Sequence, residues 1–338
     1  MKQHYKAIAL LFFSGIVILG FTLKKEVTFS GKTMGTTWHI KAVTFYLRPV
    51  GGLQKKIDQR LAAVNDSMST FMKESEISQF NALNRANTPF KISEGFMRVM
   101  KVAEKIHSIT GGAWDGTVNP LVNLWGFGSK SGQRTLPEKG EIEKALANVG
   151  FSKIEISEGA LIKKNPGTTL DLASIAKGFA VDEVASVLRE NGTRNCLVEI
   201  GGEIFASGTR KDGKKWRVGI NRPQPGAPKG AVYRALGLSD MALATSGDYR
   251  NFFESSGQRY SHIIDPRTGE SVNNGVVSVS IVAPSCTLAD GLATAVMVMG
   301  PAKGIALIER LENVECLIVT VDENGTLSDH FSSGFERS

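Results

Sequence analysis

Five segments between residues 196 and 245 read as β-strands, and they follow one another with little chain between them. The segments are 196–200, 203–207, 216–220, 233–238 and 241–245, and they are rich in β-branched, aromatic and other apolar residues. Parallel neighbours would need long crossover connections, whereas antiparallel neighbours can be joined by a tight turn such as Gly201-Gly202. Together with helix patterns elsewhere, this predicts an α+β fold of mixed, largely antiparallel sheets with packed helices, not a doubly wound parallel sheet.

Seven segments carry helix signals. Residues 173–190 give the strongest, because small and apolar side chains recur on one face and Asn191-Gly192 ends the pattern. Ser93 is a suitable N-cap for a helix over 94–110. The other predicted helices are 53–64, 75–83, 138–147, 285–299 and 301–311, and the other predicted strands are 33–45, 153–156, 160–163, 168–172, 276–283 and 314–321.

The first 29 residues read as a targeting segment, which leaves residues 30–338 for a single large domain. Lys2 and Lys6 precede an apolar run of 17 residues, 7–23, and further charges follow it. This layout is typical of a secretory signal or a single signal-anchor helix. Because no small-x-small cleavage site is evident, we expect an uncleaved anchor with the body exported, with a cleaved signal as the alternative. Positive charge on both flanks leaves the orientation open.

Composition is that of a globular protein, with 42% hydrophobic and 22% charged residues. The net charge is +7, but Lys and Arg are scattered without a run of five or six, so no nucleic-acid partner is expected. Cys196, Cys286 and Cys316 stand in apolar contexts and are predicted to be buried free thiols, although an exported protein also allows one disulfide.

Asp290 and Thr294 form the first chemical motif. They are four residues apart near the start of a predicted helix, so their oxygens share one face of it. The rest of that helix is mostly Ala, Val and Met, and two hard oxygen ligands beside an apolar wall suit a Mg²⁺ that keeps positions open for a substrate phosphate. The alternative is purely structural: Thr294 bonded to its own backbone and Asp290 near a helix start.

The second motif, residues 171–178, runs from a predicted strand into a helix start, where free amide groups and the helix dipole favour a pyrophosphate. Asp171 would cap this helix, and Lys177 is a natural phosphate partner, or else is simply solvated. The segment 111–128 holds three aromatic residues and reads either as part of a site or as a loop packed on the core. His262 stands in a third motif, Ser261-His262-Ile263-Ile264-Asp265-Pro266.

Together these segments resemble the ApbE family of flavin transferases over residues 30 to 325. The matching pieces, in family order, are 33–36, 68–71 with 75–81, 112–115 with 120–128, 171–178, 199–203, 245–248, 261–266, and Asp290 with Thr294. The resemblance implies an ApbE-like domain that cleaves the pyrophosphate of FAD with Mg²⁺. It further implies transfer of FMN, through a phosphoester, to a Thr hydroxyl of a partner protein, with release of AMP.

The same resemblance implies roles for particular residues. Asp290, Thr294 and Ser174 would hold Mg²⁺. Asp290 is also the candidate for activating the incoming hydroxyl, and His262 is the second candidate catalytic residue. The FAD site would be lined by Met34, Phe71, Ala113, Trp114, Asp115, Asp171, Lys177, His262 and Ile263. Family members often have Tyr at the position of Phe71, so ring stacking survives here but a hydroxyl is lost.

The acceptor is expected to be a membrane-associated or exported redox protein, and the chain is expected at the bacterial inner membrane with its domain on the periplasmic side. Unlike many relatives, the chain has no Cys near Gly20 for lipid attachment. Two rival functions remain: a Mg²⁺-dependent FAD pyrophosphatase that yields free FMN and AMP, and a non-catalytic exported FAD-binding protein.

Overall fold

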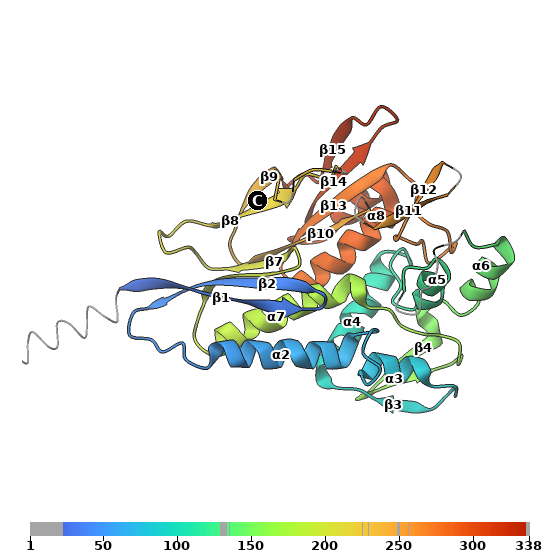
Figure 1. The fold of residues 1–338 in the computed structure, drawn as a ribbon, viewed down its shortest axis with the longest axis horizontal. Coiled ribbons are helices and arrows are strands. Elements are labelled where there is room, and N and C mark those ends of the chain that lie inside the picture. Colours follow the sequence, from blue (N-terminus) through green and yellow to red (C-terminus); the bar gives the residue numbers. More distant parts are fainter. Residues whose placement is uncertain are drawn as a thin grey trace, which may run out of the picture.

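The computed structural model describes residues 23–335, apart from 129–133, 135, 225, 229, 249–250 and 256. The predicted targeting segment therefore lies outside the described residues up to position 22. A large sheet and the helices on one of its faces make up most of the fold (Figure 1).

The sheet has eight strands in the order β1-β2-β6-β7-β10-β13-β14-β15, and every neighbouring pair is antiparallel. This confirms the predicted α+β class. The bounds are β1 Lys24–Thr33, β2 Thr36–Phe45, β6 Asn195–Ile200, β7 Glu203–Ser207, β10 Met241–Gly247, β13 Val276–Ala283, β14 Glu315–Val321 and β15 Leu327–Phe331.

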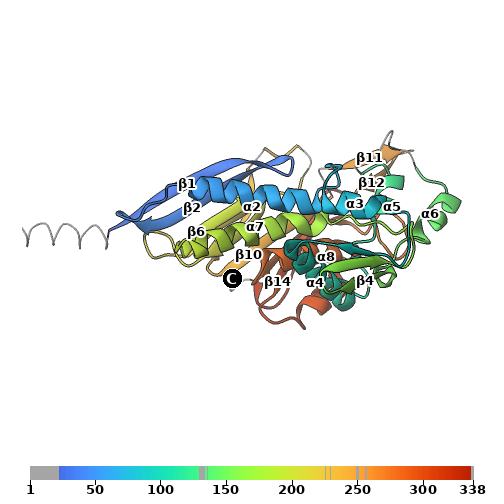
Figure 2. The same cartoon turned by 90° about the horizontal axis from the view of Figure 1, so that it is seen from below.

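Helices α2 (Leu53–Met68), α4 (Glu94–Ile109), α7 (Ala173–Glu190) and α8 (Cys286–Ile308) cover one face of this sheet (Figures 1 and 2). The largest hydrophobic core lies in between and includes Trp38, Val198 and Val279 from the sheet. The predicted stripe of α7 is buried there, because its small side chains let neighbouring helices approach closely.

A hairpin covers part of the other face of the sheet. Its strands are β8 (Trp216–Asn221) and β9 (Val232–Leu238). Alternate residues of β8 are buried, as the period of two in a strand requires, and they pack with Leu243, Val282 and Leu317 in a second core. The central strand β13 is buried along its whole length because both of its faces are covered.

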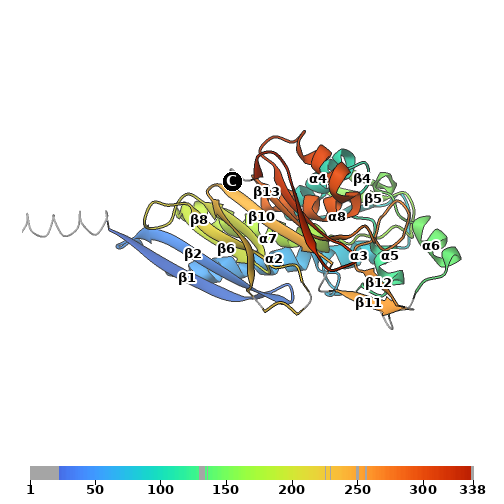
Figure 3. The same ribbon diagram turned by 90° about the horizontal axis from the view of Figure 1, so that it is seen from above.

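Smaller elements gather at the end of the molecule away from β1 (Figures 1 and 3). They are α3 (Glu76–Ala82), α5 (Asn119–Leu124), α6 (Lys139–Leu146), a 3₁₀ turn at Phe151–Lys153, the strands β3 (Pro89–Lys91), β4 (Ile154–Ser157) and β5 (Ala160–Lys163), and the hairpin β11 (Phe252–Ser255) with β12 (Gln258–Ser261). A third core packs α5 and α6 around Leu121 and Trp125.

Two predicted strands are wrong in detail. Residues 33–45 form not one strand but a turn followed by β2, since Met34 and Gly35 both have positive φ, at 49° and 71°.

The partner strand β1 begins at Lys24, so the sheet includes residues 24–29, which the sequence pattern assigned to the targeting segment. Residues 168–172 form no strand; they lead into α7, and the N–H of Asp171 bonds to the carbonyl of Gly116.

The two helices predicted over 285–299 and 301–311 are both present, and together they carry the label α8. Gly300 breaks it with φ 74° and ψ 176°, directly before Pro301. Among the described residues, α8 is the one helix that is long and apolar enough to cross a membrane, with a mean hydropathy of 1.6. Because 61% of that apolar window is buried inside the fold, its composition is that of a core helix.

The helices α7 and α8 touch at Gly178. A Cβ at this position would lie 2.3 Å from the carbonyl oxygen of Cys286 and 2.8 Å from the Cβ of Asp290. Real Cβ atoms do not come so close to backbone atoms, so the two helices can pack in this way only with glycine at 178.

We expect Gly178→Ala to lower the free energy of unfolding by about 2–4 kcal/mol, because the helices must separate. Chemical denaturation followed by circular dichroism measures this. The matched control is Gly140→Ala in α6, where a Cβ would meet nothing within 4 Å. That change should be neutral or should stabilise the protein by about 0.5–1 kcal/mol. Equal effects of the two changes would contradict the packing argument.

Candidate active site

One cavity contains most of the predicted site residues. Its volume is about 460 Å³, and it lies where the starts of α7 and α8 meet the turn before β7, the end of β10 and the chain after β12. Eight predicted residues line it: Phe71, Asp171, Ser174, Lys177, His262, Ile263, Asp290 and Thr294. The fold therefore unites motifs that are far apart in the sequence.

Asp290 and Thr294 present their oxygens from one face of α8, as their spacing predicts. The carboxylate of Asp290 is buried, and its Oδ2 accepts a 2.9 Å hydrogen bond from the N–H of Gly178. One turn later, the hydroxyls of Thr294 and Ser246 share a 3.0 Å hydrogen bond. The α7–α8 contact thus orients the carboxylate, and the end of β10 orients the hydroxyl.

The start of α8 is fixed by a carboxylate that the sequence patterns did not reveal. Asp182 of α7 accepts hydrogen bonds from the hydroxyl of Ser285 at 3.0 Å and from the N–H groups of Cys286 and Thr287, both at 2.9 Å. A carboxylate at a helix N-terminus satisfies free donors and complements the helix dipole. Asp182 therefore positions the helix that carries Asp290.

Lys177 and Glu203 form an ion pair in the wall of the cavity. Their Nζ and Oε1 atoms are 2.5 Å apart, and only 3% of the Glu203 side chain is exposed. Burial by itself lowers the pKa of Lys177, but the charges of Glu203 and Asp290 outweigh it and hold that pKa above its usual value. Lys177 therefore stays protonated, which keeps a cation in place for a phosphate.

Glu203 is the most important site residue that sequence reasoning did not assign. Its segment, 199–203, is one of the pieces that carry the family resemblance, but the sequence indicates no role for Glu203 beyond a strand–turn–strand. Burial raises the pKa of Glu203 to about 7, although Lys177 opposes this. Its second oxygen, Oε2, is buried without a hydrogen-bond partner among the described residues. A buried carboxylate oxygen left unpaired is costly, so this side of the cavity is ready for a ligand that supplies a donor or a positive charge.

His262 has a defined tautomer. Its Nδ1 lies 3.0 Å from the backbone carbonyl oxygen of Asn251, and because a carbonyl only accepts, Nδ1 carries the hydrogen. Burial lowers the pKa of His262, so the ring is neutral near pH 7 and Nε2 has a lone pair. This arrangement suits a group that takes a proton.

The four remaining predicted residues do not line the cavity. Trp114 lies behind its wall, where Nε1 donates to the hydroxyl of Ser174 over 2.9 Å, and Ala113 is buried beside it. Asp115 accepts hydrogen bonds from the N–H groups of Thr117 and Phe151 at 2.8 and 2.9 Å, so its carboxylate holds loops together.

Met34 lies in the β1–β2 turn. For these four residues, a place at the FAD site stays a prediction.

The mouth of the cavity is aromatic. Phe71 is 79% exposed although it lines the cavity, so its ring is free to contact a ligand. Phe127 stands edge-on to His262, with ring centres 6.2 Å apart. An exposed ring beside a polar cavity is typical of a surface on which a planar ligand stacks.

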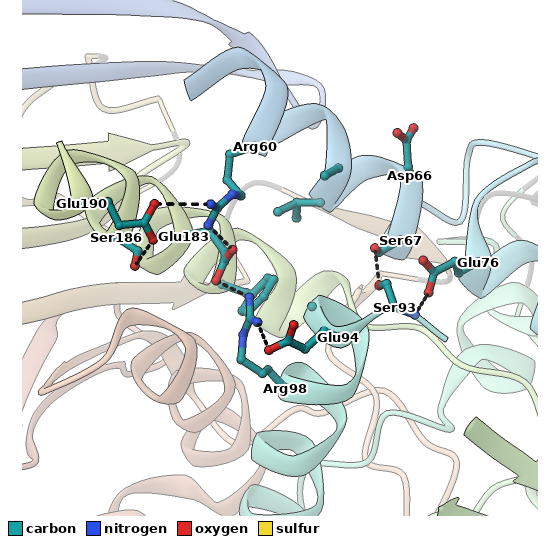
Figure 4. Close-up of a pocket in the computed structure, with 14 residues that line it drawn as sticks. Arg60, Asp66, Ser67, Glu76, Ser93, Glu94, Arg98, Glu183, Ser186 and Glu190 are labelled. Carbon is teal, nitrogen blue, oxygen red and sulfur yellow. Dashed lines mark hydrogen bonds and ion pairs between the residues drawn. The ribbon is translucent and has the colours of Figure 1, made fainter. Parts of the chain in front are cut away.

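A second hollow, of about 670 Å³, lies on the outer surface between α2, α4 and α7, and it contains none of the predicted residues. Figure 4 shows Arg60 and Arg98 converging on Glu183 in this hollow, at 2.8 and 2.7 Å. These arginines already have a carboxylate partner. The outer hollow therefore joins three helices and is not the candidate site.

The charges of the cavity indicate what it can hold. Among the described residues that line it, Lys177 is the one Lys or Arg, against the three acids Asp171, Glu203 and Asp290. Burial raises the pKa of Asp290, as does the nearby Asp182, although Lys177 and the N–H of Gly178 oppose this. With three acids around one Lys, the wall is short of positive charge. A divalent cation with oxygen ligands would correct this deficit and let an anionic substrate enter.

Most of the predicted ligands of such an ion are neutral hydroxyl oxygens. The described residues contain no cluster of three or more His, Cys, Asp or Glu that could hold a metal. The set of Asp290, Thr294 and Ser174 instead offers one carboxylate and two hydroxyls. Hard oxygen donors of this kind suit Mg²⁺ when substrate phosphates complete the coordination.

Glu203 should make stability depend on pH. Because its pKa is raised from 4.5 to about 7, its contribution to stability is fully present below pH 4.5 and is lost as the pH rises through about 7. We expect the melting temperature of the wild type to fall relative to that of Glu203→Gln across this window, in buffer without divalent ions. Glu104→Gln, on the exposed side of α4, is the control. A constant difference between the wild type and Glu203→Gln would disprove the assignment.

Fold and site together define a class: an α+β enzyme whose cavity suits a divalent ion, a diphosphate and a planar ring. The model of the ApbE family matches residues 34–318. The FAD:protein FMN transferase of Vibrio cholerae serotype O1 is 43% identical over 317 residues, which are 92% of each chain. That of Haemophilus influenzae is 38% identical over 341 residues, covering 96% of this chain and 97% of the other.

Solved structures agree. The flavin transferase ApbE from Vibrio cholerae superposes with a TM-score of 0.84 at 41% identity, covering 93% of this chain and 99% of that one. The flavinyl transferase ApbE of Pseudomonas stutzeri, in its apo form, also gives 0.84, at 34% identity and with 93% and 96% covered. The chain belongs to the ApbE family and is a transferase enzyme, which confirms the resemblance seen in the sequence.

Proposed function

We propose that this enzyme cleaves FAD with the help of Mg²⁺ and attaches FMN to a Thr of a partner protein. The observation that carries the proposal is the cavity itself: one lysine, an oxygen donor set on α7 and α8, a neutral histidine and an exposed aromatic ring around one space. The names of the relatives support flavin transfer. A diphosphate with an attached ring system is a ligand that uses all of these parts.

The reaction is a phosphoryl transfer. The Thr hydroxyl oxygen forms a bond to the phosphorus on the FMN side, the bond from that phosphorus to the bridging oxygen breaks, and AMP leaves with the bridging oxygen. The hydroxyl proton passes to a base in the cavity. Catalysis of such a step depends on positioning and on neutralising charge.

The side chains divide this work. Asp290, Thr294 and Ser174 would hold Mg²⁺, which when bound supplies the charge that neutralises the diphosphate. Lys177 donates to phosphate oxygens, with Glu203 holding it in the wall. His262, through the lone pair of Nε2, takes the hydroxyl proton; Asp290 is the alternative base. Phe71 stacks on a ring of the substrate.

One assay separates this function from its rivals. FAD and Mg²⁺ are supplied with and without an exported flavoprotein as candidate acceptor, and AMP, free FMN and covalent protein fluorescence are followed. AMP with a fluorescent acceptor band supports the transferase. AMP with only free FMN indicates a pyrophosphatase, and bound FAD without turnover indicates a carrier.

Asp290→Asn should reduce AMP release by a factor of about 10³ or more, because it removes the one carboxylate of the ion site while keeping the shape of the side chain. The assay is AMP release against Mg²⁺ concentration. Asp66→Asn, on the exposed side of α2, should leave the titration unchanged. Full Mg²⁺-dependent activity in a folded Asp290→Asn protein would exclude Asp290 as an ion ligand.

Phe71→Ala should weaken FAD binding about 3- to 10-fold, which corresponds to a lost stacking contact. Because Phe71 is 79% exposed, the free energy of unfolding should not change. Phe71→Tyr should keep the stacking and shift the ratio of flavinylated acceptor to free FMN. Calorimetric titration with FAD and the product ratio measure both effects. If neither variant changes binding or the product ratio, the ring does not contact the flavin.

The location of the enzyme is part of the proposal. The apolar run over residues 7–23 would insert into the bacterial inner membrane as an anchor, and the domain would lie on the periplasmic side. Membrane-associated or exported redox proteins would then be the acceptors within reach, because anchoring raises their effective concentration.

A further inference from the structure

An exposed apolar corner lies at the open end of the β1–β2 hairpin. Leu23, Phe45, Tyr46 and Leu47 are 50%, 40%, 61% and 50% exposed. They are four of the eight large apolar side chains that are exposed in the described part of the chain. We call these four residues the apolar corner. Such a cluster at one point is unusual on a soluble surface and marks a contact site.

The backbone holds the apolar corner together. The N–H of Tyr46 donates to the carbonyl of Leu23 over 2.8 Å, and Lys24 pairs with Phe45 in the strand register. Phe45 is the last residue of β2, and Tyr46 and Leu47 lie in the turn that follows it. Four exposed apolar side chains are therefore held next to one another at the open end of the hairpin.

Basic residues surround the apolar corner. Lys24 and Lys25 begin β1 beside the acid Glu26, and Arg48 follows the corner in the chain. The Nζ of Lys25 lies 5.5 Å from the centre of the Tyr46 ring, and Lys55 and Lys56 are exposed at the start of α2. Aromatic and basic side chains around an apolar cluster are typical of protein surfaces that contact a membrane with anionic lipids.

The sequence also places a membrane beside this corner. The apolar run over residues 7–23 ends at Leu23, which is itself a member of the corner. No chain lies between the run and the hairpin, so if the run inserts, the corner must lie at the bilayer surface. We propose that the apolar corner rests in the headgroup layer of an anionic phospholipid bilayer. This inference depends on the proposed membrane attachment, not on the flavin chemistry.

Docking in this way would leave the cavity open to proteins. The hairpin runs ten residues, from Lys24 and Phe45 at the corner to Thr33 and Thr36 at its turn. The turn adjoins the cavity, because a Cβ on the lining residue Gly201 would lie 2.8 Å from Thr36. Ten residues of strand span about 33 Å. The hairpin would hold the active site up to that distance from the lipid, and α6 lies at the opposite end of the molecule (Figure 1).

A fluorescence experiment on the full chain tests this. The four native Trp residues are buried, so their emission gives a constant background. Tyr46→Trp puts a probe in the corner, and Leu136→Trp puts one at a 50% exposed position before α6 as the matched control. The proteins are reconstituted in vesicles of phosphatidylcholine with phosphatidylglycerol, with and without brominated acyl chains as quenchers.

We expect the indole probe in the corner to lose roughly half of its added emission with brominated lipid, and the control probe before α6 to lose almost none. Lys24→Glu combined with Lys25→Glu in the Tyr46→Trp background should reduce the quenching, as should vesicles of phosphatidylcholine alone.

Two outcomes would overturn the proposal. Protein that sediments with the vesicles while the corner probe stays unquenched would exclude the corner contact and leave the anchor standing. Full-length protein that does not sediment with vesicles would exclude both. AMP release from FAD, measured on the same samples, shows separately whether the proposed chemistry holds.

Discussion

The close contact of α7 and α8 is the constraint on which the site depends. At Gly178 the two helices come so near that no side chain fits, and the N–H of that residue reaches the carboxylate of Asp290. At the other end of the contact, Asp182 binds the start of α8. The backbone N–H of Gly178 and the buried carboxylate of Asp182 therefore fix the position of α8. Asp290 is thus oriented by the fold itself, without a ligand.

The cavity built on this contact is electrostatically incomplete. Lys177 already has a partner in Glu203, whose second oxygen has none among the described residues, and burial raises the pKa of both Glu203 and Asp290. Without a ligand, such a wall lowers the stability of the folded protein, because buried carboxylates repel one another and lose their hydration. In the proposed function, a cation bound together with an anionic diphosphate would remove that cost. The free energy of unfolding that these buried carboxylates cost would then be recovered as binding free energy for the cation and the diphosphate.

Sequence patterns predicted the fold well wherever a local signal and tertiary packing agree. The small-residue stripe of α7 and the bounds of β13 are confirmed, because periodicity and burial point the same way. The strand predicted over 168–172 failed because tertiary contacts override the preference of its Thr residues. The short β11 and β12 carry too little pattern to be seen.

The site followed the same rule. Asp290 and Thr294 were found because their spacing on a helix is visible in the sequence, and the structure brings both to the cavity. Glu203 was read as part of a turn, since only the folded chain shows that it meets Lys177. In the proposed function the buried charges of the wall would bind the diphosphate, whereas the exposed Phe71 would lie on the path of the acceptor. Water and a protein hydroxyl would attack a substrate held by the same buried charges. The ratio of hydrolysis to transfer would therefore depend on the mouth of the cavity, where the Phe71 ring and the bound acceptor together exclude water.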